Sequence, residues 1–157
     1  MFRNLIMTVW KRLPAGLRRW SVRATNVKFT VTAAGIIRNN DGKVLLLQHR
    51  FRPGAGWGIP GGFLESGEQP EQALRRELRE EIDLELIDVR LFTVRTFKRQ
   101  SQIEVVFVAV ADGEPNAGNV EVDQAVWFSV NSLPDALPSD QKKLIQRALR
   151  VGAEGRD

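Results

Sequence analysis

The sequence has no cysteine and no tyrosine, and it has a single histidine, His49. Without cysteine the chain can form no disulfide framework, no thiolate metal site and no cysteine nucleophile. It also lacks any run of about 18 or more apolar residues, so no membrane span is expected. The apolar run at residues 5–10 is short and flanked by charge, which is not typical of a secretory signal. We therefore expect a cytoplasmic protein.

Acidic residues are missing from the first 30 positions, which carry seven basic side chains. The rest of the chain has 16 basic and 19 acidic residues, so its net charge is −3 although the whole chain carries +4. The basicity therefore belongs to an N-terminal arm and not to a groove across the domain. This distribution argues against nucleic acid as the partner.

Residues 1–26 are predicted to form a basic, amphipathic helical arm. Apolar residues recur there at helical spacing: Phe2, Leu5, Ile6, Val9 and Leu13. Pro14 should end this helical segment. We expect the arm to pack on its own domain or on a second copy of the chain in a homodimer. Peripheral contact with an anionic membrane surface and an organelle transit peptide are the alternatives.

The remaining length suffices for one domain with a core of its own. The predicted elements are strands at 27–38 and 43–49 joined as a hairpin, a short strand at 57–60 entering a turn at 61–62, a helix at 70–82, strands at 84–97, 103–110 and 120–129, and a helix at 141–151. This order predicts a single layered α/β domain over residues 27–151. A flexible tail is expected at 152–157.

Three carboxylates share one side of the central predicted helix. On a helical wheel, Glu77, Glu80 and Glu81 fall in one sector of roughly 100°, beside the apolar stripe that runs from Leu74 to Ile82. Like charges at this spacing destabilise a helix by ~0.2–0.5 kcal/mol per pair, and Glu81 should be partly buried. A hard divalent cation such as Mg²⁺ would neutralise them. A solvated helix with interleaved arginines is the alternative.

The segment around this helix resembles the Nudix box. Gly62 is followed after five residues by Glu68, and after seven more by the run Arg-Glu-Leu-Arg-Glu-Glu at 76–81. Asp83 stands where the box has glycine, and aspartate is one of the few residues that tolerate the left-handed conformation wanted there. The resemblance, over residues 62–84, implies a Nudix-like α/β/α sandwich. Its mixed central sheet would carry the Nudix loop-helix and a C-terminal helix.

The resemblance also implies an activity, namely Mg²⁺-dependent hydrolysis of the diphosphate linkage in nucleoside diphosphate-X compounds, with water attacking phosphorus. Mn²⁺ is the alternative ion. The implied metal ligands are Glu77, Glu80 and Glu81, with a main-chain carbonyl near Gly61 or Gly62. The implied catalytic residues are Glu80 and Glu77, either of which could act as the base, and Arg76. Glu68 would pair with Arg76 and hold the loop against the helix.

Residues outside the box add candidates. Many Nudix enzymes recruit a further carboxylate from a later loop, and we favour Glu121 over Asp123 as that metal ligand. Arg50 and Arg52 could clamp phosphate, and Trp57 could stack on a base. Exposed loop acids, solvated loop arginines and a core aromatic are the corresponding alternatives.

The missing residues narrow the subfamily. The absence of cysteine disfavours the isopentenyl-diphosphate isomerases of this superfamily, and the absence of tyrosine disfavours diadenosine-polyphosphate hydrolases. No proline occurs between Glu71 and Gly113, which weakens the likeness to ADP-ribose pyrophosphatases. Two other functions stay open: an RNA 5′-end pyrophosphohydrolase, which the basic arm favours, and a non-catalytic nucleotide-binding Nudix domain.

Overall fold

A computed structural model describes residues 14, 16–17, 27–50, 56–118 and 120–154, without the side chains of 152–154. The predictions for the arm at 1–26, apart from three positions, and for Arg52 therefore lie outside the described residues. In the part of the chain that is described, no helix is both long enough and apolar enough to cross a membrane.

A group of strands, a helix, a second group of strands and a C-terminal helix follow one another in the predicted order. The elements are β1 (Thr30–Arg38), β2 (Val44–His49), β3 (Trp57–Gly58), β4 (Gly61–Phe63), α3 (Pro70–Ile82), β5 (Leu86–Phe97), β6 (Gln102–Ala111), β7 (Val122–Phe128), the short 3₁₀ helix η1 (Val130–Ser132) and α4 (Ser139–Glu154). Helix α3 has the predicted bounds. Helix α4 continues past the predicted end at Val151, because the lone Gly152 does not break a helix.

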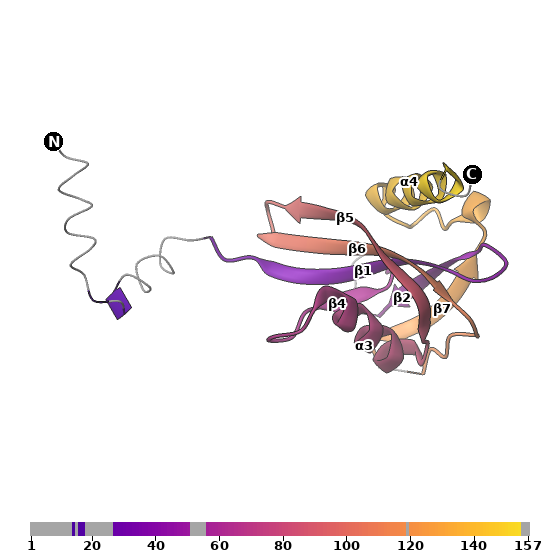
Figure 1. Ribbon diagram of the computed structural model, residues 1–157. Coiled ribbons are helices and arrows are strands. Elements are labelled where there is room, and N and C mark those ends of the chain that lie inside the picture. The colour runs from indigo at the N-terminus through magenta and orange to yellow at the C-terminus, as the bar shows by residue number, and fades with distance from the viewer. Residues whose placement is uncertain (1–13, 15, 18–26, 51–55, 119, 155–157) are drawn as a thin grey trace.

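The strands form one mixed sheet in the order β3-β2-β1-β6-β5, with β4 beside β1 and β7 beside β2 (Figure 1). β1 and β6 run parallel, and the other pairs are antiparallel. The predicted β1–β2 hairpin is present, but it is paired only where Arg38 faces Val44. The two strands then diverge, because β2 pairs along its length with β7 and residues 32–34 of β1 pair with β4.

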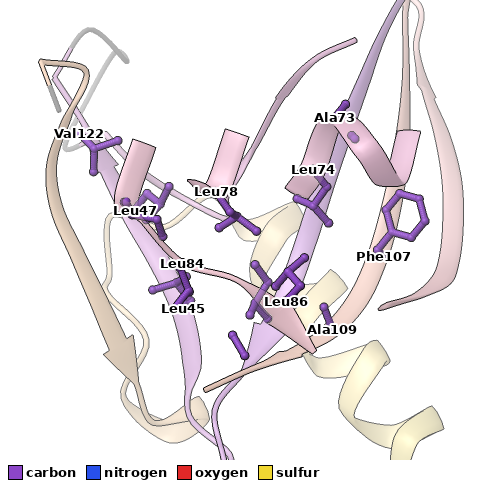
Figure 2. Packing of buried hydrophobic residues seen from close by; sticks show 14 residues of the cluster. Leu45, Leu47, Ala73, Leu74, Leu78, Leu84, Leu86, Phe107, Ala109 and Val122 are labelled. Carbon is purple, nitrogen blue, oxygen red and sulfur yellow. The ribbon is translucent and has the colours of Figure 1, made fainter. Parts of the chain in front are cut away.

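Helices α3 and α4 lie on opposite sides of the sheet (Figure 1), and each covers an apolar core. Leu74 and Leu78 of α3 pack on one face with Leu45 and Leu47 of β2 (Figure 2). On the other face, residues of α4 pack with Val44 and Leu46. Successive residues of a strand face opposite sides, so the apolar run in β2 serves both cores. This α/β/α arrangement confirms the predicted fold class.

The prediction of a turn at Gly61–Gly62 was wrong. Both glycines belong to strand β4, where Gly61 pairs with Ala34 and Gly62 with Ala33, and the chain bends at Pro60 instead. Gly61 has φ +151°, and a Cβ there would lie 2.2 Å from the Ala33 carbonyl oxygen. The close approach of β4 to β1, and not a turn, therefore requires glycine at position 61.

Candidate active site

Both ends of helix α3 are fixed by local hydrogen bonds. At the start, the Gln69 N–H donates to Oε1 of Gln72 at 3.0 Å. At the end, Asp83 takes the left-handed conformation (φ 53°, ψ 42°) predicted for the position where the box has glycine, and its N–H donates to the Arg79 carbonyl at 3.1 Å. With both ends fixed, the rotation of the helix, and hence the direction of its acidic sector, is set.

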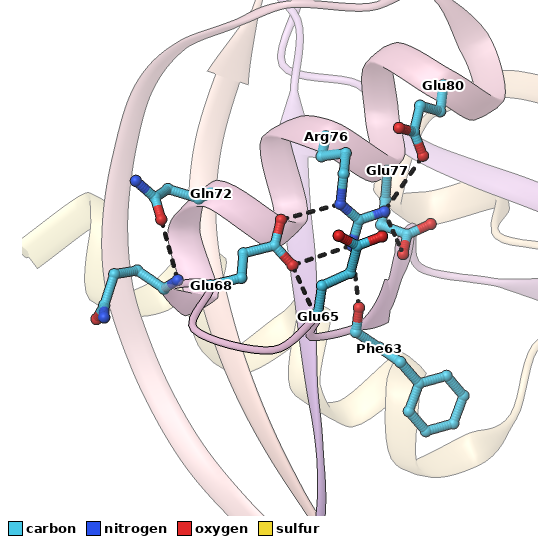
Figure 3. Close-up of polar contacts among 8 residues, drawn as sticks. Phe63, Glu65, Glu68, Gln72, Arg76, Glu77 and Glu80 are labelled. Atoms are coloured by element: carbon cyan, nitrogen blue, oxygen red, sulfur yellow. Dashed lines mark hydrogen bonds and ion pairs between the residues drawn. The ribbon is translucent and has the colours of Figure 1, made fainter.

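Arg76 and Glu68 form the ion pair that the resemblance implied (Figure 3). The guanidinium donates from Nε to Oε1 at 2.9 Å and from Nη2 to Oε2 at 3.1 Å, and Nη2 also donates to the Phe63 carbonyl at 3.1 Å. The Glu65 N–H donates to Glu68 at 2.9 Å. The Arg76 hydrogen bond is the main cause that lowers the pKa of Glu68. These contacts tie the loop after β4 to the middle of α3.

Gly62 makes room for the Glu77 carboxylate. A Cβ at position 62 would lie only 2.1 Å from Glu77 Oε1 and 2.2 Å from its carboxyl carbon. The Glu77 side chain is 18% exposed and accepts a hydrogen bond from Arg76 Nη1 at 3.1 Å. The carboxylate therefore sits directly against the backbone of β4, where any larger side chain at position 62 would displace it.

Negative charge concentrates around Glu77. Burial raises the pKa of Glu77 above its ordinary value, the charges of Glu80 and Glu121 raise it further, and Arg76 opposes them. Glu80 is 59% exposed and accepts from Arg76 Nη1 at 3.2 Å. Glu81 is 7% exposed, which confirms its expected burial beside the apolar stripe. An added cation would relieve this concentration of charge.

The structure distinguishes the two later acids. Asp123 pairs with Arg50, whose Nη2 lies 2.7 Å from Asp123 Oδ1. The charge of Glu121 acts on Glu77, and the Glu121 carbonyl accepts from the Arg50 N–H at 3.0 Å. Of the two acids, Asp123 is the one paired with an arginine in this structure, and Glu121 stays the candidate for a further metal ligand. Arg50, a candidate for phosphate binding, is held by Asp123 in this structure.

Trp57 packs into the core that α4 covers. Its ring meets Phe128 edge to face, with the ring centroids 5.1 Å apart at 89°. This contact is what the core-aromatic alternative expected. Trp57 does not line the pocket beside β4 that is described next.

Sequence reasoning missed an open pocket of about 190 Å³ at strand β4. Its polar lining comes from Thr32 of β1, Gln102 and Glu104 of β6 and Gln141 of α4, and Phe63 stands at its edge. No spacing rule links these residues, because they come from four separate elements. The one local signal was the pattern of alternation: Gln102 and Glu104 interrupt an otherwise apolar strand at every second position.

The acidic sector fits a divalent cation by its chemistry. Its carboxylate oxygens are the ligands that Mg²⁺ and Mn²⁺ prefer. Gly62 leaves the space that one of them, Glu77, occupies, and Glu81 is buried beside it. Among the described residues, no three acidic or histidine side chains already stand together as a set of ligands. Arg76 draws Glu77 and Glu80 to itself, so a cation would compete with its guanidinium for these carboxylates.

Comparison with known proteins decides the family. The NUDIX domain family matches residues 28–148 of the chain, which include β4, α3 and the whole acidic sector. The chain belongs to the NUDIX domain family. The resemblance seen in the box is thereby confirmed over the domain.

Several Nudix relatives are similar in sequence. An ADP-ribose pyrophosphatase of Methanocaldococcus jannaschii is 36% identical over 127 residues, which cover 76% of this chain and 73% of that protein. An 8-oxo-dGTP diphosphatase of Haemophilus influenzae is 34% identical over 128 residues, 78% of this chain and 93% of that protein. A NAD-capped RNA hydrolase NudC of Vibrio atlanticus is 36% identical over 100 residues, 63% of this chain. The chain spans only 37% of that NudC protein.

Solved Nudix structures share the fold. A MutT NUDIX hydrolase of Burkholderia pseudomallei superimposes with a TM-score of 0.67 at 27% identity, covering 76% of this chain and 98% of that one. The NUDIX domain of NrtR from Shewanella oneidensis, solved with ADP ribose, gives a TM-score of 0.71 at 21% identity, covering 88% and 99%. At 21% identity, the likeness to NrtR shows a shared fold and nothing further.

Proposed function

We propose that this Nudix protein hydrolyses the diphosphate linkage of nucleoside diphosphate derivatives, with Mg²⁺, or Mn²⁺ in its place, as cofactor. The fit of the Glu77 carboxylate against Gly62, beside the Arg76–Glu68 pair, carries the proposal. This fit holds the half-buried Glu77 carboxylate among other acidic side chains. Such an arrangement is expected of a cation-binding site and not of a helix whose acidic side chains are all solvated. The relatives named as pyrophosphatase and diphosphatase support it.

Each residue of the sector has a proposed part. Glu77, Glu80 and Glu81 would hold the cation, together with a main-chain carbonyl near Gly61 or Gly62, and Glu121 would add a further ligand. When bound, the cation neutralises the diphosphate and lowers the pKa of the attacking water.

The chain supplies the proton acceptor and its positioning. Glu80 or Glu77 would accept the proton of the attacking water. The water oxygen bonds to phosphorus in the same step, and the bridging P–O bond breaks. Arg76 is proposed to orient both carboxylates, because one of its nitrogens, Nη1, contacts Glu77 and Glu80 together. The pair with Glu68 would keep that nitrogen in place.

The test is a panel of nucleoside di- and triphosphate derivatives, incubated with Mg²⁺, with Mn²⁺ and with a chelator, followed by identification of products. We expect turnover that requires the ion and falls at least ~100-fold in Glu80→Gln and in Glu81→Gln. Glu71→Gln is the matched control, since Glu71 lies on the same helix but pairs with Arg75 at 2.9 Å. Nucleotide binding without turnover across the panel contradicts the proposal and favours a non-catalytic binding domain.

Hydrolysis at an RNA 5′ end is the second candidate, because a NAD-capped RNA hydrolase is among the relatives. Adding NAD-capped RNA and free NAD to the panel separates the two functions. A higher kcat/KM on capped RNA than on free NAD, with a steep fall as salt rises, would favour the RNA substrate. Equal kcat/KM values on both would favour the small nucleotide.

A further inference from the structure

The pocket beside β4 lies on the side of that strand opposite the acidic sector. Residues that lie opposite one another in neighbouring strands point to the same face of the sheet. Such a row crosses β4, β1, β6 and β5, and it consists of Phe63, Thr32, Glu104 and Arg95. Ala34, two residues beyond Thr32, packs in the core under α4, which identifies this face as the α4 face. Gly62, one residue before Phe63, faces Glu77 of α3 instead. One molecule crossing the short strand β4 could therefore reach both sites.

The Gln141 amide has only one possible orientation. The backbone N–H of Ile59 donates to Gln141 Oε1 at 2.8 Å. A backbone N–H is a donor only, so the amide oxygen must face it and the NH₂ group is turned away. Because Gln141 lines the pocket and its oxygen is engaged by Ile59, this side chain offers the pocket a hydrogen-bond donor, its NH₂ group.

The facing wall of the pocket offers acceptors. Gln102 donates through Nε2 to Thr32 Oγ1 at 2.8 Å, so its amide oxygen is left to accept. Glu104 is 13% exposed and paired with Arg95 Nε through Oε2, and an ionised carboxylate has further accepting capacity at its other oxygen.

Arg95 links the side of the pocket that carries Glu104 to the side that carries Gln141. From its place beside Glu104 it also donates to Asp140 Oδ2 at 2.9 Å, and Asp140 directly precedes Gln141 in α4. The guanidinium carbon lies 4.9 Å from the centre of the Phe97 ring, which fixes it further. The donor and the acceptors of the pocket are therefore held in place before any ligand binds.

The shape of the pocket suits a flat ring. Pockets for drug-sized ligands measure roughly 300–1,000 Å³, so about 190 Å³ holds one ring system and not a whole nucleotide. Phe63 is 62% exposed at the pocket's edge, and Figure 3 shows its ring directed away from Arg76 and Glu77. An exposed phenyl ring beside polar groups can stack on a planar ligand whose edge is hydrogen-bonded.

We propose that this pocket binds the base of the nucleotide and selects a 6-oxopurine, such as guanine, over adenine. The ring carbonyl would accept from the Gln141 NH₂ group, and the ring N–H and exocyclic amine would donate to Glu104 and Gln102. Adenine would place its exocyclic amine beside the Gln141 NH₂ group, so that two donors face each other. It would also place a ring nitrogen without hydrogen beside the Glu104 carboxylate, so that two acceptors face each other. The inference rests on the proposed function only in that the base belongs to a nucleotide whose diphosphate reaches Glu77.

The test measures binding of GMP and AMP to the full chain by calorimetry in the presence of a chelator, so it does not depend on hydrolysis. We expect GMP to bind at least ~10-fold more tightly than AMP, because unpaired polar groups would face adenine. Gln141→Glu keeps an acceptor for the Ile59 N–H and replaces the donor by an acceptor. This variant should lose the preference for GMP or reverse it.

Gln146→Glu is the matched control, since it makes the same change on an exposed position of the same helix and should keep the preference. Equal binding of GMP and AMP, a preference for AMP, no binding of either, or an unchanged preference in Gln141→Glu each overturns the proposal. GMP binding without turnover of any nucleotide would instead contradict the proposed hydrolysis and leave the base selection intact.

Discussion

Two adjacent glycines meet different physical demands at this site. Gly61 is required by the backbone, because its positive φ and the nearby Ala33 carbonyl exclude a side chain. Gly62 has no such conformation, and its missing Cβ leaves the space that the Glu77 carboxylate fills. The box marks Gly62 as a fixed position, but only the packing shows that its role is to admit a carboxylate.

Replacing Gly62 by alanine should reduce activity far more than stability. The added methyl group would overlap the end of the flexible Glu77 side chain, which can rotate away at little cost in folding free energy. Displacing a catalytic group by about 1 Å lowers the rate on the order of 100-fold, and we expect a fall of that size in kcat/KM. Steady-state kinetics together with a urea unfolding curve measures both effects.

A double-mutant cycle is the control for this prediction. On a Glu77→Ala background, Gly62→Ala has no carboxylate to displace and should cause no further loss. Additive losses in the cycle would show that Gly62 acts on something other than Glu77.

Helix α3 shows which features of an element can be read from its own residues. Its start and length follow from Pro70 and from the apolar period, and its end follows from the ability of Asp83 to adopt the left-handed conformation. The hairpin of β1 and β2 was predictable only at its turn. The later course of the two strands depends on β4 and β7, which are distant in sequence.

Substitutions at Asp83 test the end of α3. Asp83→Asn removes a negative charge from the C-terminal end of the helix and should raise the free energy of unfolding by about 0.3–0.5 kcal/mol. Asp83→Gly should stabilise by a similar amount or slightly more, while Asp83→Ala should destabilise by about 1 kcal/mol because of its positive φ. Urea denaturation compares the three variants. Equal stability of the alanine and asparagine variants would contradict this account of the cap.

At the scale of the whole molecule, the two halves of the candidate site differ in how predictable they are. The acidic sector could be predicted because Glu77, Glu80 and Glu81 lie within two turns of one helix. The pocket could not, since Gln102 and Gln141 come together only through the parallel pairing of β1 with β6 and the packing of α4 on the sheet. Strand β4 separates the two halves, and a substrate that crosses it would bring its diphosphate to one and its base to the other.

The function proposed for this protein depends on the binding of a divalent cation by the carboxylates of α3. The most direct test of this binding is a titration of the full chain with Mn²⁺, followed by electron paramagnetic resonance of the free ion. Saturable binding is expected in the wild type and in Glu71→Gln. A loss of affinity of at least ~10-fold is expected when Glu77, Glu80 and Glu81 are all changed to glutamine, in a variant shown by circular dichroism to be folded. Unchanged Mn²⁺ affinity in that folded triple variant would contradict the proposal.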